Sequence, residues 1–219
     1  MTTLDTPTAA AGTISRYWRP LAGLALIGWP CLHFLGFLTS PPGETHEPPI
    51  FREHATLVQL SAIFLHYGAI LIVPVVLGLA YLLHDRMPRL AVIAGLVGAF
   101  AAINGSALLL GDFYDLALAE SVADEQAVAV SDRAWSYAGV VYGFLLPGFL
   151  VHPALIVLTT ALAKAGRVGW WQPVLLVTGL VLPFLVASQA PIVQSVGPLL
   201  VAAALVPIGV RLLRAPAPR

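Results

Sequence analysis

Long uninterrupted apolar runs recur along this chain, and they limit its fold more than any other feature. Hydrophobic residues make up 58% of the sequence and charged residues only 10%, whereas soluble domains carry about 25% charge. A run of 18 or more apolar residues can cross a hydrocarbon core about 30 Å thick as a helix. The runs are continuous rather than alternating, so helices are favoured over the strands of a barrel. The sequence therefore predicts an all-α integral membrane protein.

Charged and proline-rich interruptions divide the chain into six predicted transmembrane helices. They cover residues 21–38, 56–83, 90–111, 135–163, 171–190 and 195–210. Together they form one predicted domain over residues 16–211, with residues 1–15 as a disordered tail and 212–219 as a second tail. The first run resembles a signal peptide, but residues 39–42 offer no small-x-small cleavage site, so we interpret it as an uncleaved helix.

The distribution of basic residues predicts the orientation of this six-helix bundle. Nine of the eleven Lys and Arg residues fall on one side of the predicted helices, which the positive-inside rule assigns to the cytoplasm. These nine are Arg16, Arg19, Arg86, Arg89, Lys164, Arg167, Arg211, Arg214 and Arg219. Both termini are then inside, and the acid-rich segments 39–55 and 112–134 face outward.

Composition also indicates a localisation and excludes several functions. Ten arginines against the single Lys164, with abundant alanine, are typical of a GC-rich bacterial genome, so we expect a multi-pass protein of the bacterial cytoplasmic membrane. The neutral net charge offers no basic face for nucleic acid. The single cysteine, Cys31, excludes internal disulfides and cysteine-based metal motifs. P-loop, HExxH, GxSxG and CxxC motifs are all absent.

Two histidines lie within the predicted spans at similar depth. His33 is twelve residues into the first helix and His66 ten residues into the second, which places both roughly 12–15 Å below the outer boundary. Ionisable groups at such depth are costly and usually functional. A third histidine, His152, counts out nearer the cytoplasmic side, although Pro147-Gly148 and Pro153 predict a kink in its helix.

The predicted site lies in the outer half of the first four helices, with the last two as scaffold. Asp112 and Asp115, at i,i+3 on one helix face, and His66 are the candidate catalytic residues. The candidate binding residues are Trp29, His33, Tyr67, Asn104, Tyr114, Trp135 and Tyr142. Aromatic rings with a few convergent polar groups are typical of a site for a lipophilic ligand.

Three functions fit these residues. The first is binding or acid–base conversion of a lipophilic small molecule, in which a carboxylic acid transfers a proton and aromatic faces stabilise a cation. That isomerase or cyclase chemistry is analogous to small multi-span terpene cyclases, but Asp112-Phe-Tyr-Asp115 lacks the doubled aspartate of diphosphate-binding signatures. It requires no cofactor.

The second function is redox chemistry at haem or copper held by His33 and His66. The third is a small transporter or an accessory subunit, although the absence of an internal repeat weakens transport. Beyond the lipid bilayer and a lipophilic ligand, the spacing of Gly139 and Gly143 predicts a helix-mediated oligomer or complex.

Overall fold

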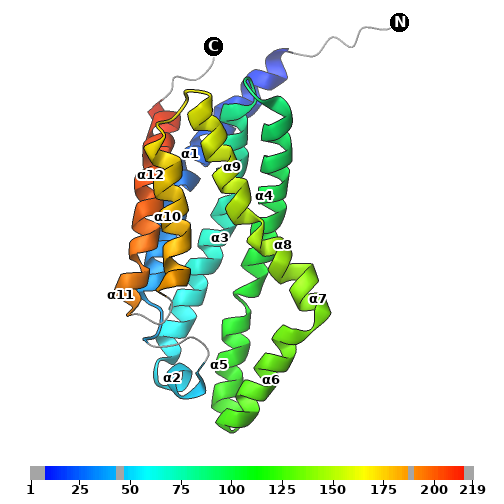
Figure 1. Cartoon of the computed structure of the whole chain (residues 1–219), viewed down its shortest axis with the longest axis vertical. Helices are drawn as coiled ribbons and strands as arrows, with labels where there is room; N and C mark the ends of the chain where they lie inside the picture. Colours follow the sequence, from blue (N-terminus) through cyan, green and yellow to red (C-terminus); the bar gives the residue numbers. More distant parts are fainter. Residues whose placement is uncertain (1–7, 43–46, 187–189, 215–219) are drawn as a thin grey trace, which may run out of the picture.

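The computed structural model describes residues 8–42, 47–186 and 190–214, and every regular element in those ranges is a helix (Figure 1). The elements are α1 Thr8–Leu38, α2 Pro48–Glu53, α3 Ala55–Leu83, α4 Pro88–Leu108, α5 Gly111–Ser121, α6 Asp124–Ser136, α7 Ala138–Val140, the π-helix η1 Val141–Leu145, α8 Leu146–Phe149, α9 Val151–Lys164, α10 Trp171–Leu185, α11 Pro191–Gln194 and α12 Val196–Arg214.

Within these residues, five helical stretches are long and apolar enough to cross a membrane. They are Tyr17–Leu38, Ala55–Leu83, Pro88–Ser121, Ala138–Lys164 and Pro191–Arg214. The remaining apolar helix, α10, has 15 residues. These findings support the predicted class, an all-α multi-pass membrane protein.

The long helices pack side by side in a ring. α1 lies between α3 and α12, α3 packs on α4, α4 on α9, α9 on α10, and α10 on α12. Fully buried side chains such as Leu26, Leu79, Leu155 and Leu205 fill the centre. Since the bundle is apolar on both its inner and outer surfaces, close packing rather than a polar exterior distinguishes its core.

Glycines allow the closest helix approaches. A Cβ on Gly209 of α12 would lie 2.7 Å from the Gly23 carbonyl oxygen of α1, and one on Gly179 of α10 would lie 2.6 Å from the Gly197 carbonyl oxygen of α12. Small residues let membrane helices approach backbone to backbone. These two glycine pairs therefore hold α12 against its neighbours.

The glycines singled out in the sequence, Gly139 and Gly143, lie elsewhere. Both are exposed, and within the described chain no neighbouring heavy atom comes within 4 Å of a Cβ built on either one. They consequently mediate no close helix approach inside this molecule. The oligomer or complex contact expected from their spacing stays a prediction.

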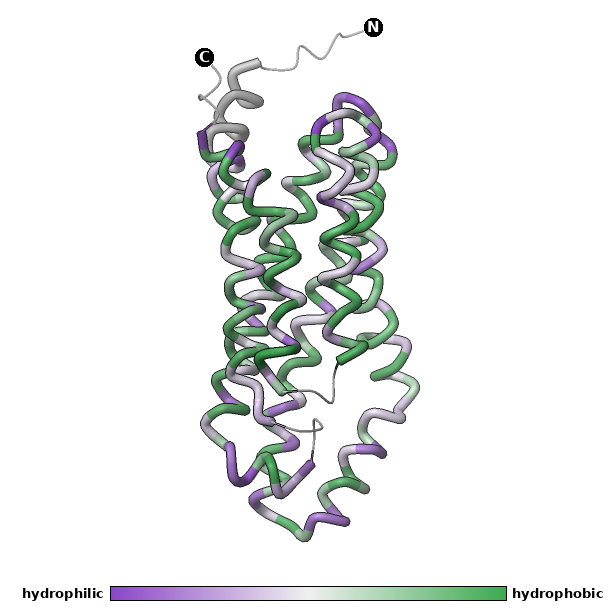
Figure 2. Tube along the Cα trace, turned by 60° about the vertical axis from the view of Figure 1, so that its left-hand side comes forward, coloured by the Kyte–Doolittle hydropathy of each residue, from purple (hydrophilic) through white to green (hydrophobic). Residues whose placement is uncertain are grey.

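The bundle has two hydrophilic ends separated by an apolar middle (Figure 2). α1 begins, α12 ends, and the α3–α4 and α9–α10 loops lie at one of these ends, which we call the basic end (Figure 1). Its basic residues include Arg86, Arg89, Lys164, Arg167, Arg211 and Arg214. Gly166, with φ of 70°, ends α9 in the left-handed conformation that favours glycine.

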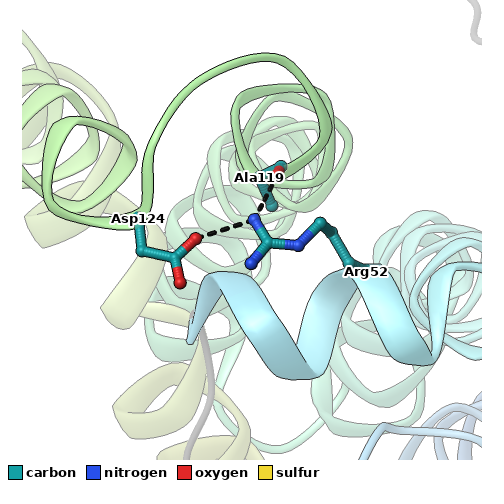
Figure 3. Close-up of polar contacts among 3 residues, drawn as sticks. All are labelled: Arg52, Ala119 and Asp124. Atoms are coloured by element: carbon teal, nitrogen blue, oxygen red, sulfur yellow. Dashed lines mark hydrogen bonds and ion pairs between the residues drawn. The ribbon is translucent and has the colours of Figure 1, made fainter.

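The opposite end carries α2, α5 and α6, which we call the cap (Figure 1). Phe51, Val58, Leu116 and Ala119 form its small buried core. Arg52 Nη1 lies 2.7 Å from Asp124 Oδ1 and donates to the Ala119 carbonyl at 2.6 Å (Figure 3). This arginine joins α2 to both α5 and α6.

Several boundaries differ from those predicted. α1 begins at Thr8, so residues 8–15 are helical where a disordered tail was expected, consistent with the high helix propensity of their alanines. Residues 1–7 and 215–219 of the predicted tails lie outside the described residues. α4 ends at Leu108 rather than 111, α10 ends at Leu185 rather than 190, and the predicted outer segment 112–134 forms α5 and α6.

Candidate functional site

A cavity of about 440 Å³ lies inside the helix ring, in the half of the bundle away from the basic end. Its wall comes from α1, α3, the end of α4, η1 and α8, α9, α10, α11 and α12. The lining is overwhelmingly apolar. The polar side chains that reach it include His33, His152 and Gln194.

His33 is held in the wall by neighbours on both sides. The indole Nε1 of Trp29, one turn earlier on α1, donates to the His33 ring and lies 3.1 Å from its Nδ1. Leu65 of α3 lines the same cavity wall as His33. Gly68 leaves the space for the ring, since a Cβ on Gly68 would overlap His33 Cδ2. Internal contacts thus determine the orientation of His33.

The position of His152 depends on the proline that follows it. Pro153 has no N–H, so the carbonyl of Phe149, four residues before it, lacks its usual helical donor. His152 Nδ1 lies 3.2 Å from that carbonyl oxygen. A carbonyl only accepts, so Nδ1 carries the proton, and in the neutral ring Nε2 retains a lone pair.

Two residues of the cavity lining, Phe149 of α8 and Phe184 of α10, are 45% and 60% exposed, which indicates that the cavity opens between these two helices. Their ring centroids are 6.1 Å apart, and His152 lies against both rings at 5.9 and 5.7 Å. η1, α7 and α8 lean away from the bundle below α9 (Figure 1). The opening faces the surroundings of the bundle rather than either end.

Of the residues predicted from the sequence, Trp29 and His33 line this cavity. His66 does not line it. Its Nδ1 lies 3.2 Å from the carbonyl of Ser106, one of the last carbonyls of α4, which lack helical donors. His66 therefore secures the end of α4 to α3, and His33 and His66 do not meet in one pocket.

The other candidates also lie outside the cavity wall. Tyr67, Tyr114 and Tyr142 are 57%, 65% and 71% exposed. Asn104 donates to the Phe100 carbonyl of its own helix at 2.8 Å, and a Cβ on Gly111 would lie 2.8 Å from the Trp135 ring. Asp112 and Asp115, both half-buried, belong to α5 at the cap, and each interacts within the protein.

His152 is the site residue whose place sequence counting misses. Counting from residue 135 assumes a straight helix, whereas the structure has a π-helix at Val141–Leu145 and a break at Leu150. Pro147-Gly148 and Pro153 were the signal for this break. α10 and α12, expected to be scaffold, supply Phe184 and Val201 to the wall.

The described residues offer no preformed set of metal ligands. Among them, no group of three or more His, Cys, Asp and Glu side chains lies close enough together to hold an ion. No protein-family model, curated protein or solved structure matches this chain. The cavity is therefore the feature of the molecule that bears most directly on function.

Proposed function

We propose that this protein binds a lipophilic small molecule in the cavity inside its helix ring. The observation that carries the proposal is an apolar enclosure of about 440 Å³ with two imidazoles in its wall. Ligand sites are typically apolar hollows of about 300–1,000 Å³ with a few placed polar groups. The sideways opening favours a ligand that dissolves in the bilayer.

Binding is better supported than acid–base conversion by the aspartates. Asp112, Asp115 and His66 are all absent from the cavity wall, and a general acid or base must reach the proton it transfers. The groups that can contact a ligand are His33 and His152. The proposal therefore assigns recognition to these two histidines and gives Asp112 and Asp115 no part in it.

The haem or copper alternative has less support. Axial ligation needs two imidazoles that face one cofactor, but His66 is turned to the Ser106 carbonyl and lies outside the cavity wall. His33 is engaged by Trp29. An optical spectrum of the purified protein tests this alternative, since bound haem gives a Soret band.

We further propose six membrane crossings, with α10 as the sixth. α10 spans about 22 Å at 1.5 Å per residue, short of the roughly 30 Å hydrocarbon core. However, α1 begins and α12 ends at the same end of the bundle (Figure 1), which requires an even number of passes. α10 also runs beside α12 from the basic end toward α11.

The basic end is proposed to face the cytoplasm of a bacterium. The loops at that end carry the basic residues, and the positive-inside rule places such loops in the cytoplasm. Both termini are then inside. The cap, with Glu120, Asp124, Glu125 and Asp132, faces outward in this orientation. The cavity then lies in the outer half of the bilayer.

Extraction of bound molecules tests the function. We expect apolar small molecules to co-purify with the protein and to be found by mass spectrometry of solvent extracts. Leu180→Trp fills the cavity, because Leu180 lines it, and should lower the yield at least severalfold. Val181→Trp, on the exposed side of the same helix, is the matched control. Equal yields from the two variants would contradict the proposal.

A further inference from the structure

We infer that the ligand of this cavity is a lipophilic alcohol or phenol whose hydroxyl donates a hydrogen bond to Nε2 of His152. The inference rests on the proposed function and adds the chemical class of the ligand. It follows from which hydrogen-bonding groups in the wall are already engaged, and from where the remaining acceptor lies.

Nε2 of His152 is the acceptor that the wall leaves open. Nδ1 carries the proton and donates to the Phe149 carbonyl, so the lone pair of a neutral ring is on Nε2. Among the described residues, no hydrogen-bond partner of this nitrogen is seen. A buried polar atom that is left without a hydrogen bond costs free energy. Because Nε2 carries a lone pair, the partner that satisfies it must be a hydrogen-bond donor.

The other polar groups of the wall are already engaged. The Trp29 indole N–H donates to the His33 ring, which also packs closely against Gly68 of α3. Gln194, which is buried, interacts within the protein. These contacts leave His152 as the group that selects a polar headgroup.

The wall also favours a neutral headgroup over an anionic one. No lysine or arginine is among the residues that line the cavity in the described chain, so a carboxylate, phosphate or diphosphate would be buried without a counter-charge. A hydroxyl has one donor and no formal charge. It therefore matches a single imidazole acceptor in an otherwise apolar site.

The place of His152 gives the orientation of the bound molecule. Its ring lies against both Phe149 and Phe184, the two exposed residues of the cavity lining. The hydroxyl is then bound at the opening, and the apolar body extends inward toward Trp29 and Ile72. A molecule dissolved in the bilayer reaches this position without crossing an aqueous phase.

Two isomeric probes test the hydroxyl requirement. Decan-1-ol and methyl nonyl ether have the same atoms and differ in the O–H donor. Each is titrated into the full-length protein in phosphatidylcholine nanodiscs, and affinity is taken from the ligand-dependent rise in thermal stability, with concentration expressed as mole fraction in the bilayer. We expect the alcohol to bind about fivefold more tightly, as one net hydrogen bond allows.

Variants separate the inference from the proposed function. His152→Phe should bring the alcohol-to-ether ratio close to one, whereas Leu180→Trp should weaken both probes and Val181→Trp neither. If both isomers bind native protein equally but Leu180→Trp weakens both, the hydroxyl inference is overturned and the cavity function stands. If Leu180→Trp changes neither probe, both fail. The comparison in native protein is decisive even where His152→Phe does not fold.

Discussion

The three intramembrane histidines differ by the partners of their ring nitrogens. His66 donates to the end of α4, His33 is held by Trp29 and packs against Gly68, and His152 keeps one nitrogen available. The first two stabilise helix contacts, and His33 also shapes the cavity wall. Two histidines that sequence counting places at equal depth therefore need not act together. Each ring turns toward its own hydrogen-bond partners.

Gly68→Ala should destabilise the protein through His33. The new methyl group would overlap the imidazole, and overpacking of this kind typically costs about 1–3 kcal/mol. The measurement is the free energy of unfolding in detergent, with ligand extraction as a second readout.

Gly139→Ala is the matched control for that substitution. Gly139 is also in a helix but has open space around it, and alanine in an unhindered helix is favourable by about 0.5–1 kcal/mol. The two variants should therefore change stability in opposite directions. A Gly68→Ala protein as stable as Gly139→Ala would show that the His33 ring moves freely.

At the scale of elements, breaks in the helices shape the cavity. The chain from Ala138 to Lys164 was predicted as one span, but it contains a π-helix and a break at Leu150. Pro153, just after the break, leaves the Phe149 carbonyl without its usual helical donor, and His152 Nδ1 bonds this oxygen instead. The Pro147-Gly148 pair predicts that an interruption occurs, but neighbouring helices decide where the broken halves lie.

The cap should loosen when the Arg52 contacts are removed. Asp124 accepts a hydrogen bond from Arg52 and raises the pKa of this arginine above its ordinary value. Arg52 therefore stays charged at every physiological pH, so ionic strength rather than pH weakens the pair, since salt screens exposed charges. Arg52→Ala and Asp124→Asn should each speed hydrogen exchange in α2 and α6.

Arg133→Ala is the control for the cap. It removes a basic charge from the same end of the molecule, and Arg133 has no ion pair among the described residues. Exchange should stay at the native rate in this variant and should rise in native protein at 1 M salt. Unchanged exchange in Arg52→Ala would mean that the small apolar core around Phe51 holds the cap unaided.

At the scale of the whole molecule, the arrangement of the helices is the basis for the proposed number of crossings. α1 begins and α12 ends at the basic end, so the proposal of six crossings counts the short α10 as one of them. Single cysteines in a Cys31→Ser background test this arrangement. We expect a membrane-impermeant maleimide to label Glu125→Cys in intact cells, and Arg86→Cys and Arg214→Cys only after lysis. Labelling of both Glu125→Cys and Arg214→Cys in intact cells, with Arg86→Cys still protected, would indicate five crossings.

The sequence by itself determined the class of this protein, because lipid requires each apolar run to satisfy its own backbone hydrogen bonds. It also singled out Trp29 and His33, which local spacing places on one face of α1 and which line the cavity. It did not bring His152 to His33 or α10 and α12 to the cavity wall, because these depend on how broken helices pack across the ring. Only the tertiary structure decided which polar groups satisfy one another and which imidazole nitrogen of the cavity wall has no partner among the described residues.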